Sequence, residues 1–127
     1  MLDFSENTEA HSLLIVDDDE PFRNRLARAM EKRGFAVTTA ASVSEGCNVA
    51  RRDKPTYAAL DLRLEDGSGL EIVKELQDSQ PEARIVVLTG YGNIATAVAA
   101  VKAGAIDYLP KPADADDVEK ALLADPS

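Results

Sequence analysis

Five short, mostly apolar segments recur along the chain, and polar or charged residues lie at or just past the ends of four of them. These segments are residues 13–16, 35–39, 57–60, 84–88 and 106–109. A run of four or five such residues is typical of a strand that is buried on both faces of a sheet. The sequence therefore predicts a sheet that is covered by helices on both sides.

Amphipathic stretches separate the five segments. In the first stretch, Phe22, Leu26 and Met30 recur on one helical face. Pro21 suits the first turn of this helix, and Gly34 suits the position just after its end. The spacing therefore predicts a helix between the first two strands.

Four further helices are expected over residues 42–52, 68–79, 94–102 and 114–123. Ser42 opens the first of these, and Glu45 three residues later completes a capping box. Strands that alternate with helices of this length are joined by right-handed crossovers and form a parallel sheet. The expected fold class is α/β, with a doubly wound five-stranded parallel sheet and five helices.

The length and composition indicate one domain. A chain of 127 residues, 45% of them hydrophobic, is large enough to bury a core. Residues 12–124 are expected to form this domain. Residues 1–11 are polar and acidic, unlike a signal peptide, and are expected to form a disordered leader.

Charge and cysteine content exclude several functions. A net charge of −9 opposes binding of this segment to nucleic acid or to an anionic membrane. No apolar run approaches the ~18 residues of a membrane span. The single cysteine, Cys47, excludes an internal disulfide and fits a reducing compartment. We therefore expect a cytoplasmic domain.

Polar groups stand where the predicted strands end. Residues 17–19 are three aspartates after the first strand, Asp61 ends the third, Thr89 ends the fourth, and Lys111 lies just past the fifth. Parallel sheets of this class bind ligands beyond the carboxyl ends of their strands. Carboxylates brought together there repel one another unless a cation lies between them, and Mg²⁺ suits such oxygen ligands.

These residue types also suit phosphoryl transfer. The carboxylate of Asp61 can attack phosphorus and form an acyl phosphate. Thr89 can hydrogen-bond one phosphoryl oxygen, and Lys111 can neutralise another. Each residue alone is weak evidence, but their joint placement predicts a phosphoryl-transfer site that works by position and charge.

The receiver domains of two-component response regulators resemble this chain over residues 12–124, in the stretches LLIVDDDEPF, ALDLRLEDGSGLEIV, IVVLTGYG and AIDYLPKPADADDV. The resemblance implies a flavodoxin/CheY-like fold with strand order 2-1-3-4-5. It also implies that a sensor histidine kinase donates the phosphoryl group, and it identifies Asp61 as the phosphoacceptor. For the Mg²⁺ cofactor it implies that Asp18 binds directly, Asp17 through water, and Arg63 through its backbone carbonyl.

The same resemblance assigns a switching role to three other residues. Thr89 matches the switch hydroxyl, Lys111 the phosphate-binding lysine, and Tyr108 the aromatic residue that turns inward on activation. The family pattern also implies a cis bond between Lys111 and Pro112. No essential position of the family is missing, so the chain is expected to depend on phosphorylation.

A closer similarity is carried by AMEKRGF, DLRLEDGSGL and VVLTGYGNIATAVAAVKAGAIDYLPKPADA, which resemble the RegA/PrrA/ActR group of redox-responsive regulators. Members of that group join the receiver, through a hinge, to a helix-turn-helix that binds DNA. The resemblance implies that residues 125–127 begin such a linker, and that the output domain for transcription regulation is absent from this segment.

Association through the last two helices is expected to be weak. Many receivers dimerise through these helices and the strand between them, and in regulators with winged-helix outputs acidic–basic pairs join that face. This chain keeps the acidic positions at Asp107 and Asp117. The usual arginine positions hold Ala97 and Ala121. Like charges near a two-fold axis oppose association. We therefore expect a monomer, with at most a weak homodimer after phosphorylation.

Two other functions compete with this interpretation. A haloacid-dehalogenase-type phosphatase also begins with an aspartate after an apolar strand, but it needs an acidic pair after the lysine, and Leu109–Lys111 is followed by no such pair. It would also leave Asp61 without a role. A protein-interaction module that ignores phosphate would bind its partner equally well after Asp61→Ala. We therefore expect no enzyme activity beyond the domain's own phosphorylation and dephosphorylation.

Overall fold

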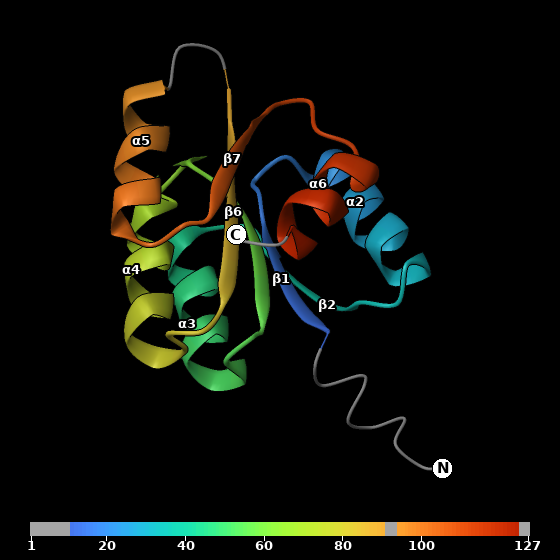
Figure 1. Cartoon of the computed structure of the whole chain (residues 1–127), viewed down its shortest axis with the longest axis horizontal. Coiled ribbons are helices and arrows are strands. Elements are labelled where there is room, and N and C mark those ends of the chain that lie inside the picture. The colour runs from blue at the N-terminus through green and yellow to red at the C-terminus, as the bar shows by residue number, and fades with distance from the viewer. Residues whose placement is uncertain (1–10, 91–93, 125–127) are drawn as a thin grey trace.

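The structure is a computed structural model that describes residues 11–90 and 94–124, and it consists of one sheet between two layers of helices (Figure 1). Five parallel strands form the sheet in the order β2-β1-β3-β6-β7. Their bounds are β1 Ser12–Val16, β2 Ala36–Ala40, β3 Tyr57–Asp61, β6 Arg84–Thr89 and β7 Asp107–Pro110. The predicted class and the strand order 2-1-3-4-5 are confirmed.

Five helices cover the two faces of the sheet. They are α2 Glu20–Lys32, α3 Val43–Asp53, α4 Leu70–Ser79, α5 Ile94–Ala103 and α6 Ala115–Leu123. Helices α3, α4 and α5 lie on one face, and α2 and α6 lie on the other (Figure 1). Strand β1 shows why both layers are needed. Leu14 and Val16 pack in one core cluster, Leu13 and Ile15 pack in the other, and all four are at most 1% exposed.

The predicted helix ends are largely confirmed. Gly34 follows α2 with φ 99°, a conformation that glycine adopts without steric cost. The Ser42 hydroxyl accepts a hydrogen bond from the backbone N–H of Glu45 at the start of α3. The Glu45 carboxylate accepts from the N–H of Ala41, not of Ser42, so the expected capping box is displaced by one residue.

A short hairpin follows β3 and was not predicted. Strands β4 (Arg63–Leu64) and β5 (Gly67–Ser68) pair antiparallel, with Arg63 opposite Ser68. Two-residue strands are too short to show a periodic pattern. Because these residues belong to the hairpin, α4 begins at Leu70, two residues later than the sequence indicated.

The structure also limits or corrects other expectations. Most of the expected leader, residues 1–10, lies outside the described residues, as do residues 125–127. No helix in the described ranges is long and apolar enough to cross a membrane. Ala97 and Ala121 are 0% and 8% exposed in the core. Placing these two positions on a contact surface was therefore wrong.

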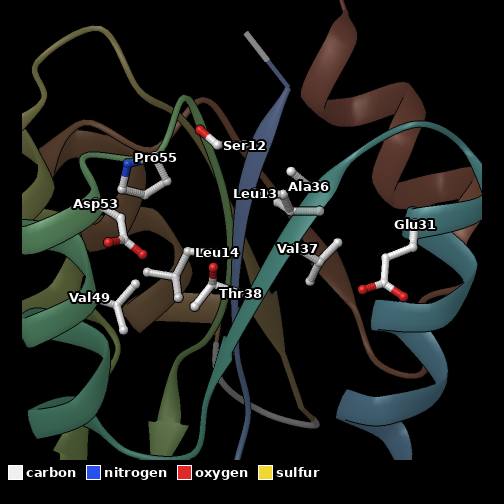
Figure 2. A pocket seen from close by; sticks show the side chains of 10 residues that line it. All are labelled: Ser12, Leu13, Leu14, Glu31, Ala36, Val37, Thr38, Val49, Asp53 and Pro55. Atoms are coloured by element: carbon white, nitrogen blue, oxygen red, sulfur yellow. The ribbon is translucent and has the colours of Figure 1, made fainter. Parts of the chain in front are cut away.

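A hollow of about 510 Å³ opens where β1 and β2 begin (Figure 2). Apolar side chains such as Val37 and Val49 line it, and Glu31 and Asp53 reach it from α2 and α3. It lies at the opposite end of the strands from the aspartates that follow β1. This hollow is therefore separate from the cluster of aspartates.

Arg84 joins the start of β6 to the end of α6. Its Nε donates to the carbonyl of Leu122 at 2.6 Å, and its Nη2 donates to the carbonyl of Ala124. The last carbonyls of a helix lack partners within the helix and carry partial negative charge. The guanidinium therefore caps α6 from the sheet.

Replacing this arginine is expected to destabilise the domain. Hydrogen bonds that involve a charged group contribute about 1.5–3 kcal/mol, so Arg84→Ala should lower the free energy of unfolding by about that amount. Urea denaturation followed by circular dichroism measures the change. Arg52→Ala is the control, because the Arg52 guanidinium pairs with its exposed neighbour Asp53, and an exposed ion pair contributes little to stability. Equal losses in the two variants would contradict the capping role.

Candidate functional site

Three carboxylates meet where β1 and β3 end. Asp17 and Asp18 directly follow β1, and Asp61 is the last residue of β3. One carboxylate oxygen from each lies within 4.8 Å of the other two. Asp17 and Asp61 are 0% and 4% exposed, whereas Asp18 is exposed. Parallel pairing of β1 with β3 brings these groups together, because it places the carboxyl ends of both strands at one edge.

The ammonium group of Lys111 lies against two of these carboxylates. Its Nζ is 2.9 Å from Oδ2 of Asp17 and 3.4 Å from Oδ2 of Asp61. The backbone N–H of Lys111 donates to the carbonyl of Thr89 at 2.7 Å, so β7 leads directly to the end of β6. The bond between Lys111 and Pro112 is cis, which confirms that prediction.

Backbone groups hold the two buried carboxylates in place. Oδ1 of Asp61 accepts from the N–H of Arg63 at 3.1 Å, and Oδ1 of Asp17 accepts from the N–H of Asp19 at 2.9 Å. Asp19 itself caps α2 by accepting from the N–H of Phe22, and it is not among the three clustered carboxylates. The third aspartate of the triplet therefore serves the helix.

Sequence reasoning missed three residues that support the site. Phe22 was assigned to the helix core, but Nζ of Lys111 lies 5.0 Å from its ring centroid, within cation–π range. Arg23 donates to the backbone carbonyl of Asp17 at 2.9 Å. A Cβ on Gly69 would come within 2.2 Å of the Asp61 carbonyl oxygen, so only glycine fits there. No local pattern signals these contacts, which depend on the tertiary fold.

The charges at this edge do not balance. Burial raises the pKa of Asp61 to about 6; the N–H of Arg63 opposes this rise, and the charge of Asp17 adds to it. Burial disfavours the charged form of Lys111, but its contacts with Asp17 and Asp61 outweigh that effect and raise its pKa. Three carboxylates against one ammonium leave an excess of two negative charges.

This donor set fits a divalent cation. Carboxylate oxygens are the ligands that Mg²⁺ and Ca²⁺ prefer, and the excess charge equals that of one such ion.

Thr89 is 3% exposed at the end of β6, the strand next to β3. Tyr108 on β7 is 36% exposed, so its ring lies outside the core. Tyr91, two residues past Thr89, lies outside the described residues.

Comparison with known proteins gives consistent results. The model of the response regulator receiver domain family matches residues 13–123. The photosynthetic apparatus regulatory protein RegA of Cereibacter sphaeroides is 66% identical over 113 residues, which cover 89% of this chain and 61% of RegA. The acid tolerance regulatory protein ActR of Rhizobium meliloti is 60% identical over 91% of this chain and 59% of ActR. The chain thus spans about three fifths of the length of these relatives.

Solved structures share the fold. A response regulator protein from Burkholderia pseudomallei, crystallised with a phosphorylated aspartic acid, calcium ion and citrate, is 45% identical with a TM-score of 0.84. That match covers 91% of this chain and 68% of the other. The receiver domain of NtrX from Brucella abortus is 31% identical with a TM-score of 0.78, over 89% of this chain and 99% of the other.

The raised pKa of Asp61 predicts a pH-dependent stability in EDTA. Because folding raises this pKa from 3.8 to about 6, the folded domain retains a proton that the unfolded chain releases in this range. The free energy of unfolding should therefore fall as pH rises from 3.8 through 6. In Asp61→Asn, the free energy of unfolding should fall by about 1–3 kcal/mol less over the same pH range, because each pKa unit corresponds to about 1.4 kcal/mol.

Urea denaturation of both proteins across this pH range measures the difference. Other groups also titrate there, so only the difference between the two profiles reports on Asp61. The Asn variant should be the more stable of the two at neutral pH. Parallel profiles would show that Asp61 titrates with an ordinary pKa.

Proposed function

The chain belongs to the response regulator receiver domain family, and from this premise we propose that it accepts a phosphoryl group from a sensor histidine kinase on Asp61. The family resemblance stated from the sequence, including the similarity to RegA and ActR, is confirmed. The observation that carries the proposal is the buried carboxylate of Asp61 between Asp17, Asp18 and Lys111. The related protein from Burkholderia pseudomallei, crystallised with a phosphorylated aspartic acid, supports it.

The proposed reaction is a direct transfer. A carboxylate oxygen of Asp61 attacks the phosphorus of a phosphohistidine on the kinase. A P–O bond forms, the P–N bond breaks, and its electron pair stays on the imidazole nitrogen. The N–H of Arg63 orients the attacking carboxylate through Oδ1. Lys111 already lies 3.4 Å from Oδ2, where it can neutralise a phosphoryl oxygen, and the Thr89 hydroxyl is proposed to bind another.

The cation of this site is proposed to be Mg²⁺. Asp18 and Asp61 would bind it directly, Asp17 through water, and Arg63 through its backbone carbonyl. When bound, Mg²⁺ supplies positive charge to the oxygens of the transferred group. It would also keep Asp61 ionised, since a nearby positive charge opposes the effect of burial on its pKa.

The proposed role of phosphorylation is to change conformation. The phosphoryl group adds roughly −1.5 to −2 charge beside Lys111 and Thr89. Movement of Thr89 toward it would free space for the ring of Tyr108, which lies outside the core in this structure. Two packings would then exchange population, and a DNA-binding output domain beyond this segment would respond.

The remaining expectations are part of the same proposal. Residues 12–124 form the receiver, residues 1–11 a leader, and residues 125–127 the start of a linker. The domain acts in the cytoplasm as a monomer, or as a weak homodimer when phosphorylated, and contacts neither membrane nor nucleic acid. Its chemistry is limited to its own phosphorylation and dephosphorylation.

Labelling by a small phosphodonor tests the acceptor. With acetyl phosphate and Mg²⁺, the intact mass should increase by one phosphoryl group that hydroxylamine removes. EDTA should prevent the increase, because the phosphate would then face the carboxylates without a screening cation. Asp61→Asn should abolish labelling, whereas Asp78→Asn, which alters an exposed carboxylate on α4, should retain it. Full labelling of the Asp61 variant, or labelling mapped to Asp17, would refute the assignment.

A second experiment tests the coupling between Thr89 and Tyr108. In protein labelled with fluorotyrosine, the ¹⁹F resonance of Tyr108 should shift when acetyl phosphate is added. Thr89→Ala should remove most of this shift, because this variant lacks the hydroxyl that is proposed to move toward the phosphoryl group. Thr38→Ala on the distant strand β2 is the control and should keep it. An unchanged response in the Thr89 variant would exclude this coupling.

A further inference from the structure

Asp66 connects the hairpin after β3 to the first turn of α3. It lies in the turn between β4 and β5, and its Oδ1 accepts from the N–H of Val43 at 2.8 Å. Its Oδ2 accepts from the N–H of Ser44 at 3.1 Å. These two hydrogen bonds lower the pKa of the Asp66 carboxyl, so it is ionised at neutral pH. One charged side chain thus satisfies two donors that the helix itself leaves without partners.

The other donors of this turn have partners within their own segment. Ser42 accepts from the N–H of Glu45 through its hydroxyl, and from the N–H of Gly46 through its carbonyl. Glu45 in turn accepts from the N–H of Ala41. Helix α3 therefore has two side-chain caps at its start. Ser42 provides a local cap, and Asp66 provides a second one from the hairpin.

The hairpin also reaches the site. Arg63, the first residue of β4, donates its N–H to Oδ1 of Asp61 at 3.1 Å. Its partner Ser68 leads to Gly69, whose N–H donates to the carbonyl of Leu62 at 3.0 Å. Only two residues, Leu64 and Glu65, separate Arg63 from Asp66 along the chain. A shift of Asp66 would therefore act on Arg63 through only these two residues.

We propose that Asp66 is a positioning residue for the cation site, because it holds the β4–β5 hairpin on α3 and thereby fixes the backbone of Arg63. This inference rests on the proposed function, in which the Arg63 carbonyl binds the cation. The hairpin has two residues in each strand, and so short a ladder does not hold a backbone by itself. Its position depends on anchors at both ends: Asp61 with Gly69 at the base, and Asp66 at the turn.

A purely structural role would have a different consequence. If Asp66 only stabilised α3, its loss would resemble the loss of any other cap of the same turn. Ser42→Ala provides that comparison, because it removes a side-chain cap from α3 and leaves the contacts of the hairpin intact. Both substitutions should lower the unfolding temperature, and Asp66→Ala should lower it more, because it removes two hydrogen bonds to a charged group. Only the substitution of Asp66 should alter the cation site.

Titration of the ¹⁵N-labelled 127-residue chain with Mg²⁺ separates the two roles. Amide shifts, recorded well below the unfolding temperature, give the affinity without any phosphodonor. Asp66→Ala should weaken Mg²⁺ binding about tenfold or more, as does loss of other residues that orient metal ligands. Ser42→Ala should leave the affinity unchanged. Asp66→Asn, which retains one acceptor oxygen, should fall between them and provides the test if the alanine variant does not fold.

The outcomes distinguish this inference from the proposed function. Weaker Mg²⁺ binding after both Asp66 substitutions, with normal binding by Ser42→Ala, supports the positioning role. Normal affinity in the Asp66 variants overturns it and leaves the cation site in place. If the unsubstituted chain does not respond to Mg²⁺, the proposed cation site is overturned, and the role of Asp66 with it.

Discussion

Repulsion among three carboxylates at one edge of the sheet is the constraint on which this structure depends. Asp17 and Asp61 are almost fully buried, and a carboxylate oxygen of each lies within 4.8 Å of one from Asp18. The arrangement follows from the parallel sheet. Apolar side chains fill both faces of β1 and β3, so the polar residues stand at the strand ends, and parallel pairing brings these ends together. The fold thus creates a concentration of charge that its neighbouring elements must offset.

Much of the surrounding structure serves this purpose. The ammonium of Lys111 contacts Asp17 and Asp61, and the ring of Phe22 supports it from α2. Two backbone N–H groups hold the buried carboxylates in place: that of Arg63 donates to Asp61, and that of Asp19 donates to Asp17. One ammonium cannot neutralise three carboxylates, so burial still raises the pKa of Asp61 to about 6. The carboxyl ends of β1 and β3 therefore retain an excess of negative charge that a bound cation can offset.

The sequence predicted what local patterns determine. A change from apolar to polar residues marks where a buried strand ends. This change placed four residues at one edge of the predicted sheet: Asp17, Asp61, Thr89 and Lys111. The sequence did not predict the β4–β5 hairpin, because strands of two residues show no periodic pattern. It also did not predict the contacts of Arg84 and Asp66, because these join residues 22 to 40 positions apart. The placement of Ala97 and Ala121 on a contact surface was wrong for a related reason. A position inferred from the family pattern does not reveal whether a small side chain lies on the surface or in the core.

The contacts of Lys111 also explain why a change at Asp61 need not stay local. Its ammonium contacts both buried carboxylates, and its backbone N–H donates to the carbonyl of Thr89. A phosphoryl group would add roughly −1.5 to −2 charge, and the three donors of the ammonium would have to be shared with it. Strands β6 and β7 pair along their length, with Val87 opposite Tyr108. In the proposed switch, a displacement of Lys111 or Thr89 would therefore reach Tyr108 through one pair of neighbouring strands.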